Sequence, residues 1–193
     1  MNFRGGARAS IADITGDGKG DLVIAAGFGG GPRVGVFDGV KLSAEGNLGE
    51  TTFARSNGWK PFGDFLVFEA GLRNGAFVTA GDFDADGFAD LIAGGGPGGG
   101  PRVTAFSGKG LLGGQQTVLA NFFAGDVNSR GGVRVAVKNL DGDARADLVV
   151  GAGTAAGSRV TSYAGKAVGA SGTPPELFAF DALAGFAGGV FVG

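Results

Sequence analysis

Three copies of one sequence pattern run through this chain of 193 residues, and this repetition restricts the fold more than any other feature. The acidic loops of the copies begin at Asp13, Asp82 and Asn139. A repeat of this length is one supersecondary unit, which buries its apolar faces against the neighbouring copies. We therefore expect a row of similar small units rather than one irregular core.

Each copy contains four short segments rich in β-formers and separated by glycine-rich turns. In the second copy these segments are "AFVTAG", "DLIAGG", "RVTAF" and "TVLANFF". Four strands per repeat predict an all-β fold of β-propeller blades, each a four-stranded antiparallel sheet packed on the next. Helical solenoids are excluded by the 43 glycines and by the period-2 alternation in "VRVAVKN".

The repeats divide the chain, a single repeat domain over 1–193, into three blades and a remainder. The predicted boundaries are 4–70, 71–125 and 126–182 for the blades, and 183–193 for the inner strand of an incomplete fourth blade. Three blades fall short of the four to eight of a typical propeller. The chain is therefore expected to be a fragment of a longer array, or a subunit whose open ends are completed by copies of itself.

The first blade carries an insertion over 42–63 that the other copies lack. Its single tryptophan, Trp59, has two possible roles. It could stack on a sugar ring or anchor a protein contact, or it could cap the exposed end of the first blade.

Composition argues against several classes of function. A net charge of −2 without a dense basic block is unlike a nucleic-acid or anionic-membrane surface, and no stretch is long and apolar enough for a membrane span. The chain has no cysteine and no histidine, so it lacks thiol nucleophiles, zinc–thiolate sites and the commonest general base. We predict that it is not an enzyme. "MNFRGG" has no apolar segment of a signal peptide, so any targeting signal is expected outside this chain.

The acidic loops offer the hard oxygen ligands that Ca²⁺ prefers. Positions 1, 3, 5 and 9 of each loop carry oxygen-bearing side chains, and position 7 would contribute its backbone carbonyl. The candidate ligands of loop 1 are Asp13, Thr15, Asp17, Lys19 and Asp21. Those of loop 2 are Asp82, Asp84, Asp86, Phe88 and Asp90. Those of loop 3 are Asn139, Asp141, Asp143, Arg145 and Asp147.

Two alternative interpretations of these loops are weaker. An EF-hand requires a glutamate at position 12, where this chain has Ile24, Ala93 and Val150. Ordinary acidic turns would explain one loop, because Asp and Gly are common turn residues, but they explain three copies in register less well. The sequence thus predicts up to three calcium ions, one per repeat.

Loop 3 departs from the other two. It has Asn139 at position 1, and Ala144 stands where the other loops have Gly18 and Gly87. We expect Ala144 to be forced to a positive φ, at a cost of about 1 kcal/mol. One fewer carboxylate also weakens the attraction for a cation. The third site is therefore predicted to bind most weakly and the second most tightly.

The loop pattern D-x-[DT]-x-D-G-x-x-D-L, preceded by a glycine-led strand and followed by "GGGPRVxxF", resembles FG-GAP (VCBS-type) repeats. These occur in the integrin α-subunit propeller and in many large bacterial extracellular proteins. The resemblance implies calcium held between the first and second strands of each blade, usually in a seven-bladed ring. It also implies an extracellular or cell-surface scaffold or recognition module for adhesion, with a protein or polysaccharide partner.

Two other functions stay open. The chain could be a structural subunit that self-assembles through its unfinished blades into a homo-oligomer or filament. It could also belong to a polysaccharide-acting lyase or hydrolase, because some FG-GAP-like propellers do.

Two further repeated features have a structural explanation. The runs "GFGGGPR" and "GGGPGGGPR" lack the GK[ST] of a phosphate loop and are predicted to be turns between strands. Arg33, Arg102 and Arg159 follow these turns at equivalent positions, where they could also meet acidic sugars or a partner's carboxylates.

Overall fold

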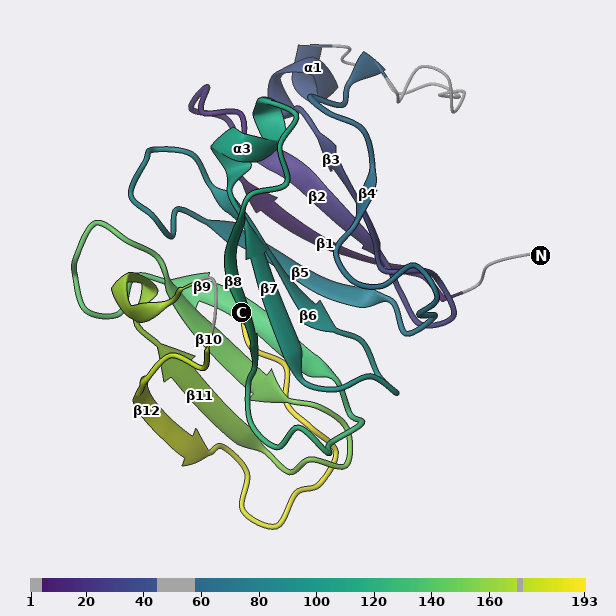
Figure 1. Cartoon of the computed structure of the whole chain (residues 1–193), viewed down its shortest axis with the longest axis vertical. Helices are drawn as coiled ribbons and strands as arrows, with labels where there is room; N and C mark the ends of the chain where they lie inside the picture. Colours follow the sequence, from purple (N-terminus) through teal and green to yellow (C-terminus); the bar gives the residue numbers. More distant parts are fainter. Residues whose placement is uncertain (1–4, 45–57, 170–171) are drawn as a thin grey trace.

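The computed structural model describes residues 5–44, 58–169 and 172–193 as three four-stranded antiparallel sheets, one per repeat (Figure 1). The first sheet comprises β1 (Ala7–Ala12), β2 (Asp21–Ala26), β3 (Arg33–Phe37) and β4 (Phe65–Leu66). The second comprises β5 (Ala76–Gly81), β6 (Asp90–Gly95), β7 (Arg102–Phe106) and β8 (Val118–Phe123). The third comprises β9 (Val133–Lys138), β10 (Asp147–Ala152), β11 (Arg159–Tyr163) and β12 (Glu176–Asp181). The predicted all-β class is confirmed.

The strands of each sheet follow chain order, and each strand pairs antiparallel with the next one along the chain. Three of the four strands predicted in the second copy coincide with β5, β6 and β7 residue for residue, and the fourth begins one residue before β8. The same register recurs in each repeat, as the pairs Leu22–Phe37, Leu91–Phe106 and Leu148–Tyr163 show. The repeat pattern of the sequence is therefore a repeat of hydrogen-bond registers.

A short helical turn follows the third strand of every sheet, which the sequence analysis did not predict. These turns are α1 (Gly39–Ala44), α3 (Gly108–Leu112) and η1 (Gly165–Ala167). Within the ranges that the structure describes, no helix is long and apolar enough to cross a membrane.

The sheets pack face to face, and the core lies between them. Side chains of the first sheet such as Val23 and Val36 meet Val78 and Leu91 of the second in one buried cluster. The other face of the second sheet forms a second cluster with the third sheet, in which the rings of Phe122 and Tyr163 meet edge to face at 5.2 Å between centroids. Because both faces of the second sheet are covered, its strands β5, β6 and β7 are almost continuous runs of buried residues.

Successive sheets approach each other closely at Gly75 and Gly132, which precede β5 and β9, and Gly6 and Gly189 stand at the equivalent positions before β1 and in the C-terminal segment. Gly6, Gly75, Gly132 and Gly189 all have positive φ, between 68° and 79°. A Cβ on Gly132 would lie 2.3 Å from the carbonyl oxygen of Gly95, so no side chain fits there. The glycine thus allows the entering strand to lie directly against the preceding sheet.

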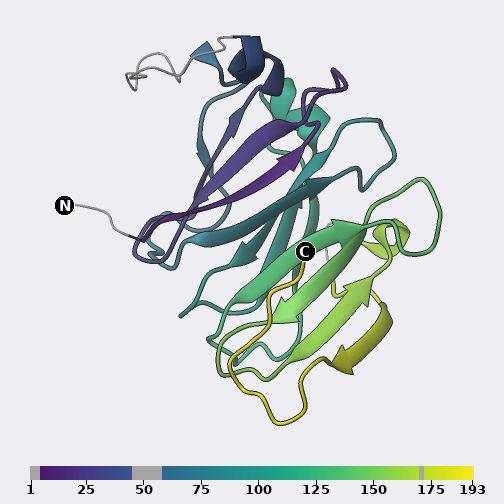
Figure 2. The ribbon, with the colours of Figure 1, turned by 180° about the vertical axis from the view of Figure 1, so that it is seen from behind.

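Residues 183–193 were predicted to be a strand, but the structure assigns no strand there. The segment does lie along the third sheet as β9 lies along the second, with the N–H of Val190 donating to the Ala152 carbonyl at 3.0 Å (Figure 2). Its one bridge pairs Gly188 with Gly157. The segment occupies the position that the first strand of a fourth sheet would have. It is not paired as a strand, because the described part of the chain contains no further strand beside it.

Candidate metal-binding loops

The three acidic loops lie on the same side of the molecule, each joining the first two strands of its sheet (Figure 1). Loops 2 and 3 are each hydrogen-bonded to the loop before them. The N–H of Ala89 in loop 2 donates to the Asp13 carbonyl at 2.9 Å, and the N–H of Ala146 in loop 3 donates to the Asp82 carbonyl at 2.7 Å. The loops therefore form a connected row.

The aspartate at position 9 fastens each loop to the helical turn after the third strand. Asp90 has no exposed surface, and its two carboxylate oxygens accept N–H groups of Phe83 at 2.8 Å and Gly108 at 3.0 Å. The same contacts recur at Asp21 (with Ile14 and Gly39) and at Asp147 (with Leu140 and Gly165). Burial raises the pKa of Asp90 to about 6. These residues were predicted to be metal ligands, and the structure gives them a further role that holds the hairpin in place.

Loop 2 brings together the other three predicted carboxylates. Asp82, Asp84 and Asp86 each offer an oxygen, and these atoms all lie within 4.8 Å of one another. Backbone groups order the loop around them: the N–H of Gly87 donates to Asp82 at 2.9 Å and that of Phe88 donates to Asp86 at 3.0 Å. Burial, together with the neighbouring Asp86 charge, raises the pKa of Asp84. The hard oxygen donors and their mutual repulsion suit a cation such as Ca²⁺.

Loop 1 has the same outline with fewer converging carboxylates. Asp13 accepts N–H groups of Gly16 at 2.7 Å and Gly18 at 2.8 Å, while Asp17 accepts that of Lys19 at 2.8 Å. Position 3 is Thr15, whose hydroxyl lies 3.4 Å from Asp21. Among the residues that the structure describes, loop 2 alone gathers three carboxylates.

Loop 3 is built differently. The oxygen of Asn139 accepts the N–H of Gly142 at 2.7 Å, and its amide nitrogen donates to the Asp143 carbonyl. The Lys166 ammonium lies 2.6 Å from Asp141 and 3.6 Å from Asp143. Its hydrogen bond lowers the pKa of Asp141, the opposite of the shift at the equivalent Asp84.

The expectation that Ala144 takes a positive φ is wrong. Gly18 and Gly87 do so, at 83° and 87°, but Ala144 does not. The Asn139 amide holds the Asp143 carbonyl, and the loop closes without a left-handed residue at position 6. The strain predicted for loop 3 is therefore absent at this residue.

The side chains at position 7 of loops 2 and 3 contact the preceding loop, which the sequence analysis did not predict. Phe88 covers Gly16, where an added Cβ would lie 2.5 Å from the ring. Arg145 donates to the Phe83 carbonyl at 3.0 Å. The sequence does carry a sign of these contacts, because position 7 of each loop is an aromatic or a long basic residue.

The repeated arginines each have an acidic neighbour. The nitrogen–oxygen distances are 4.0 Å for Arg33–Asp64, 2.6 Å for Arg102–Glu69 and 3.8 Å for Arg159–Asp181. They are surface pairs of the sheets, so a role with acidic ligands stays a prediction.

Trp59 is only 7% exposed, and its carbonyl accepts the N–H of Asp38 at 2.8 Å. A buried ring is not presented to a ligand. Of the predicted insertion, residues 45–57 lie outside the described residues.

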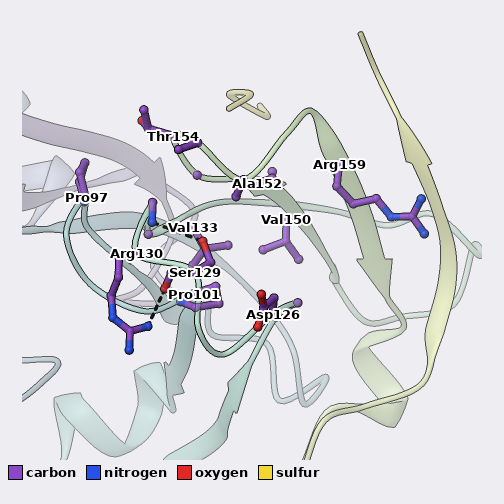
Figure 3. Close-up of a pocket in the computed structure, with 18 of the residues that line it drawn as sticks. Pro97, Pro101, Asp126, Ser129, Arg130, Val133, Val150, Ala152, Thr154 and Arg159 are labelled. Atoms are coloured by element: carbon purple, nitrogen blue, oxygen red, sulfur yellow. Dashed lines mark hydrogen bonds between the residues drawn. The ribbon is translucent and has the colours of Figure 1, made fainter. Parts of the chain in front are cut away.

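A cavity of about 820 Å³ lies between the second and third sheets, at the strand ends opposite to the acidic loops (Figure 3). Pro101, Val133 and Val150 line it together with glycine-rich backbone, and Asp126 adds a carboxylate. The guanidinium groups of Arg130 and Arg159 point away from its centre (Figure 3). The cavity therefore combines an apolar floor with polar side chains such as Asp126, Asn128 and Thr161, and no sequence motif indicated it.

Comparison with solved structures finds a distant structural likeness. No family model and no curated protein sequence matches the chain. Its structure is similar to that of a rhamnogalacturonan lyase from Bacillus licheniformis, with a TM-score of 0.53 and 15% sequence identity. The likeness covers 92% of this chain and 34% of the lyase, so the chain spans about a third of that protein. At this identity the likeness concerns the fold alone.

Proposed function

We propose that this chain is a calcium-stabilised β-propeller segment of FG-GAP type, which acts as an extracellular scaffold or recognition module. The observation that carries the proposal is the loop 2 cluster, where three carboxylates converge in a hairpin ordered by backbone N–H groups. The equivalent packing of consecutive sheets supports the assignment of each sheet as a blade.

Asp82, Asp84 and Asp86 would hold the calcium ion, with the Phe88 carbonyl as a further ligand. The ion would supply positive charge where three carboxylates otherwise repel one another. Since the ligands converge only in the folded hairpin, its binding free energy would add to fold stability.

Thermal unfolding with calcium and with EDTA tests this proposal. Calcium should raise the melting temperature of the full chain, and Asp84→Asn should remove most of that increase. Asp126→Asn is the matched control, because Asp126 lines the distant cavity and should leave the calcium response unchanged. An unchanged melting curve of the wild-type chain in EDTA would contradict the proposal.

A polysaccharide or protein is the proposed partner. The cavity between the second and third sheets supports this, because a concave surface with an apolar floor and a few polar groups is typical of ligand sites. A glycan array and a protein pull-down, each run with calcium and with EDTA, would identify the partner. Equal absence of binding in both conditions would count against a recognition role.

Self-assembly is a second candidate function, favoured by one apolar face. Ala9, Ile11 and Ile24 of the first sheet occupy the positions of Val78, Ala80 and Ala93, which are buried under the first sheet. Ile11 is 72% exposed. Sedimentation velocity should show a larger species that Ile11→Asp dissociates; a wild-type monomer at all concentrations would argue against this function.

An enzymatic role has less support. The likeness to a rhamnogalacturonan lyase fits the alternative of a polysaccharide-acting enzyme, but it concerns the fold alone. Tyr163, the single tyrosine, is buried, and burial raises its pKa to about 12, so it is poorly suited to serve as an accessible base. That the chain is not an enzyme stays a prediction.

A further inference from the structure

The residue after the first glycine of each helical turn differs between the repeats. Gly39, Gly108 and Gly165 are equivalent, because each donates its N–H to the buried aspartate at position 9. The residue that follows them is Val40 in the first repeat, Lys109 in the second and Lys166 in the third. This position lies beside the acidic loop. A lysine here can place its ammonium near the loop carboxylates, whereas a valine cannot.

The two lysines are placed differently. The Lys109 ammonium stands 3.9 Å from Asp86 and 5.4 Å from the centre of the Phe88 ring. The Lys166 ammonium makes a 2.6 Å hydrogen bond to Asp141 and lies 3.6 Å from Asp143. Lys109 thus makes one long ion pair at the edge of loop 2, whereas Lys166 contacts two predicted metal ligands of loop 3.

Position 7 accounts for this difference. In loop 2 the Lys109 ammonium lies over the face of the Phe88 ring, which attracts a cation and is a second partner for it besides Asp86. In loop 3 the residue is Arg145, whose side chain extends to the Phe83 carbonyl of loop 2. In the described part of the chain no aromatic ring takes this place beside Lys166, and its ammonium contacts Asp141 and Asp143.

Position 1 of loop 3 also disfavours a metal ion. The Asn139 amide nitrogen donates to the Asp143 carbonyl, and its oxygen accepts the N–H of Gly142. Asn139, which is uncharged and uses both its oxygen and its nitrogen in hydrogen bonds, stands where loop 2 has the carboxylate of Asp82. Oxygens of loop 3 that would otherwise bind Ca²⁺ thus already have protein donors, which disfavours binding of the ion.

We propose that the Lys166 ammonium takes in loop 3 the place that calcium takes in loop 2, so that the third repeat closes its loop without metal. Lysine carries three N–H donors and no acceptor, which suits a position between two carboxylates. The inference about metal stoichiometry rests on the proposed calcium site of loop 2. The inference about loop 3 itself does not, because a lysine that replaces a metal should act in the metal-free protein.

Lys166→Met and its matched control Lys109→Met test the proposal in the full chain. Both variants remove an exposed ammonium and keep the length of the side chain. In EDTA, Lys166→Met should lower the melting temperature, because Asp141 and Asp143 lose their counter-charge, and Lys109→Met should have a smaller effect. In calcium titration calorimetry, Lys166→Met should bind one more ion than the wild type, and Lys109→Met should bind as many as the wild type.

The outcomes separate this inference from the proposed function. Wild-type binding of three calcium ions would overturn the inference and leave the proposed function standing. A melting temperature in EDTA that Lys166→Met leaves unchanged would also overturn it. If the wild type binds no calcium but Lys166→Met alone lowers that melting temperature, the role of Lys166 is supported and the calcium proposal fails.

Discussion

Replacing Asp90 with alanine should destabilise the fold whether or not calcium is present. The carboxylate has no exposed surface and accepts two backbone N–H groups, from Phe83 and Gly108. Its removal leaves both donors without a partner, at a cost of about 1–3 kcal/mol for each. The free energy of unfolding should therefore fall by about 2–6 kcal/mol.

The pH dependence of this loss has a definite sign. Burial raises the pKa of Asp90 from 3.8 to about 6, so the folded state binds this proton more tightly than the unfolded state. The stability that Asp90 contributes is then complete below pH 4 and declines as the pH rises through about 6. After allowance for solvent screening, the loss on Asp90→Ala should be about 1–3 kcal/mol smaller at pH 7.5 than at pH 4.

Urea unfolding at pH 4 and pH 7.5, in EDTA and in excess calcium, measures these effects. Asp84→Ala is the comparison, because Asp84 belongs to the carboxylate cluster and its loss should appear chiefly in calcium. A destabilisation by Asp90→Ala that disappears in EDTA would refute the reasoning, since it would make Asp90 a metal ligand without a fastening role.

Two further predictions concern the contacts between sheets. Gly132→Ala should lower the stability measured by thermal unfolding more than Gly114→Ala does. Both residues have positive φ, so alanine costs about 1–2 kcal/mol at either position. Only at Gly132 would the new Cβ also meet backbone, 2.3 Å from the Gly95 oxygen. Equal costs would contradict the close approach of the sheets. Phe122→Ala should cost about 3–5 kcal/mol in urea unfolding, because its ring is buried between the second and third sheets; a cost below 1 kcal/mol would contradict that burial.

The sequence predicted the strands well because their signals are local. Short apolar runs bounded by glycine and aspartate define β5, β6 and β7 without reference to any other part of the chain. The helical turns were missed because they depend on a distant acceptor: the N–H of Gly108 binds Asp90, 18 residues earlier. Residues 183–193 have strand-like sequence but no strand pairing, which sequence periodicity cannot supply.

The candidate site was predicted in part for a similar reason. Spacing identified Asp82, Asp84 and Asp86 as a group, and the structure brings them together. Spacing could not show whether Asp90 binds a metal ion or accepts backbone hydrogen bonds, because a carboxylate is suited to both roles. Lys166 was missed because it lies 25 residues from Asp141, and only the fold shows that the two side chains meet.

The hydrogen bonds between neighbouring loops have a consequence for how the repeats unfold. Loop 2 donates a hydrogen bond to the Asp13 carbonyl of loop 1, and loop 3 donates one to the Asp82 carbonyl of loop 2. Neighbouring hairpins therefore stabilise each other. Nearest-neighbour coupling of this kind makes a row of repeats behave as a one-dimensional cooperative chain. Loss of order should then start at the terminal hairpins and advance inward, and hydrogen exchange should be slowest at the middle repeat.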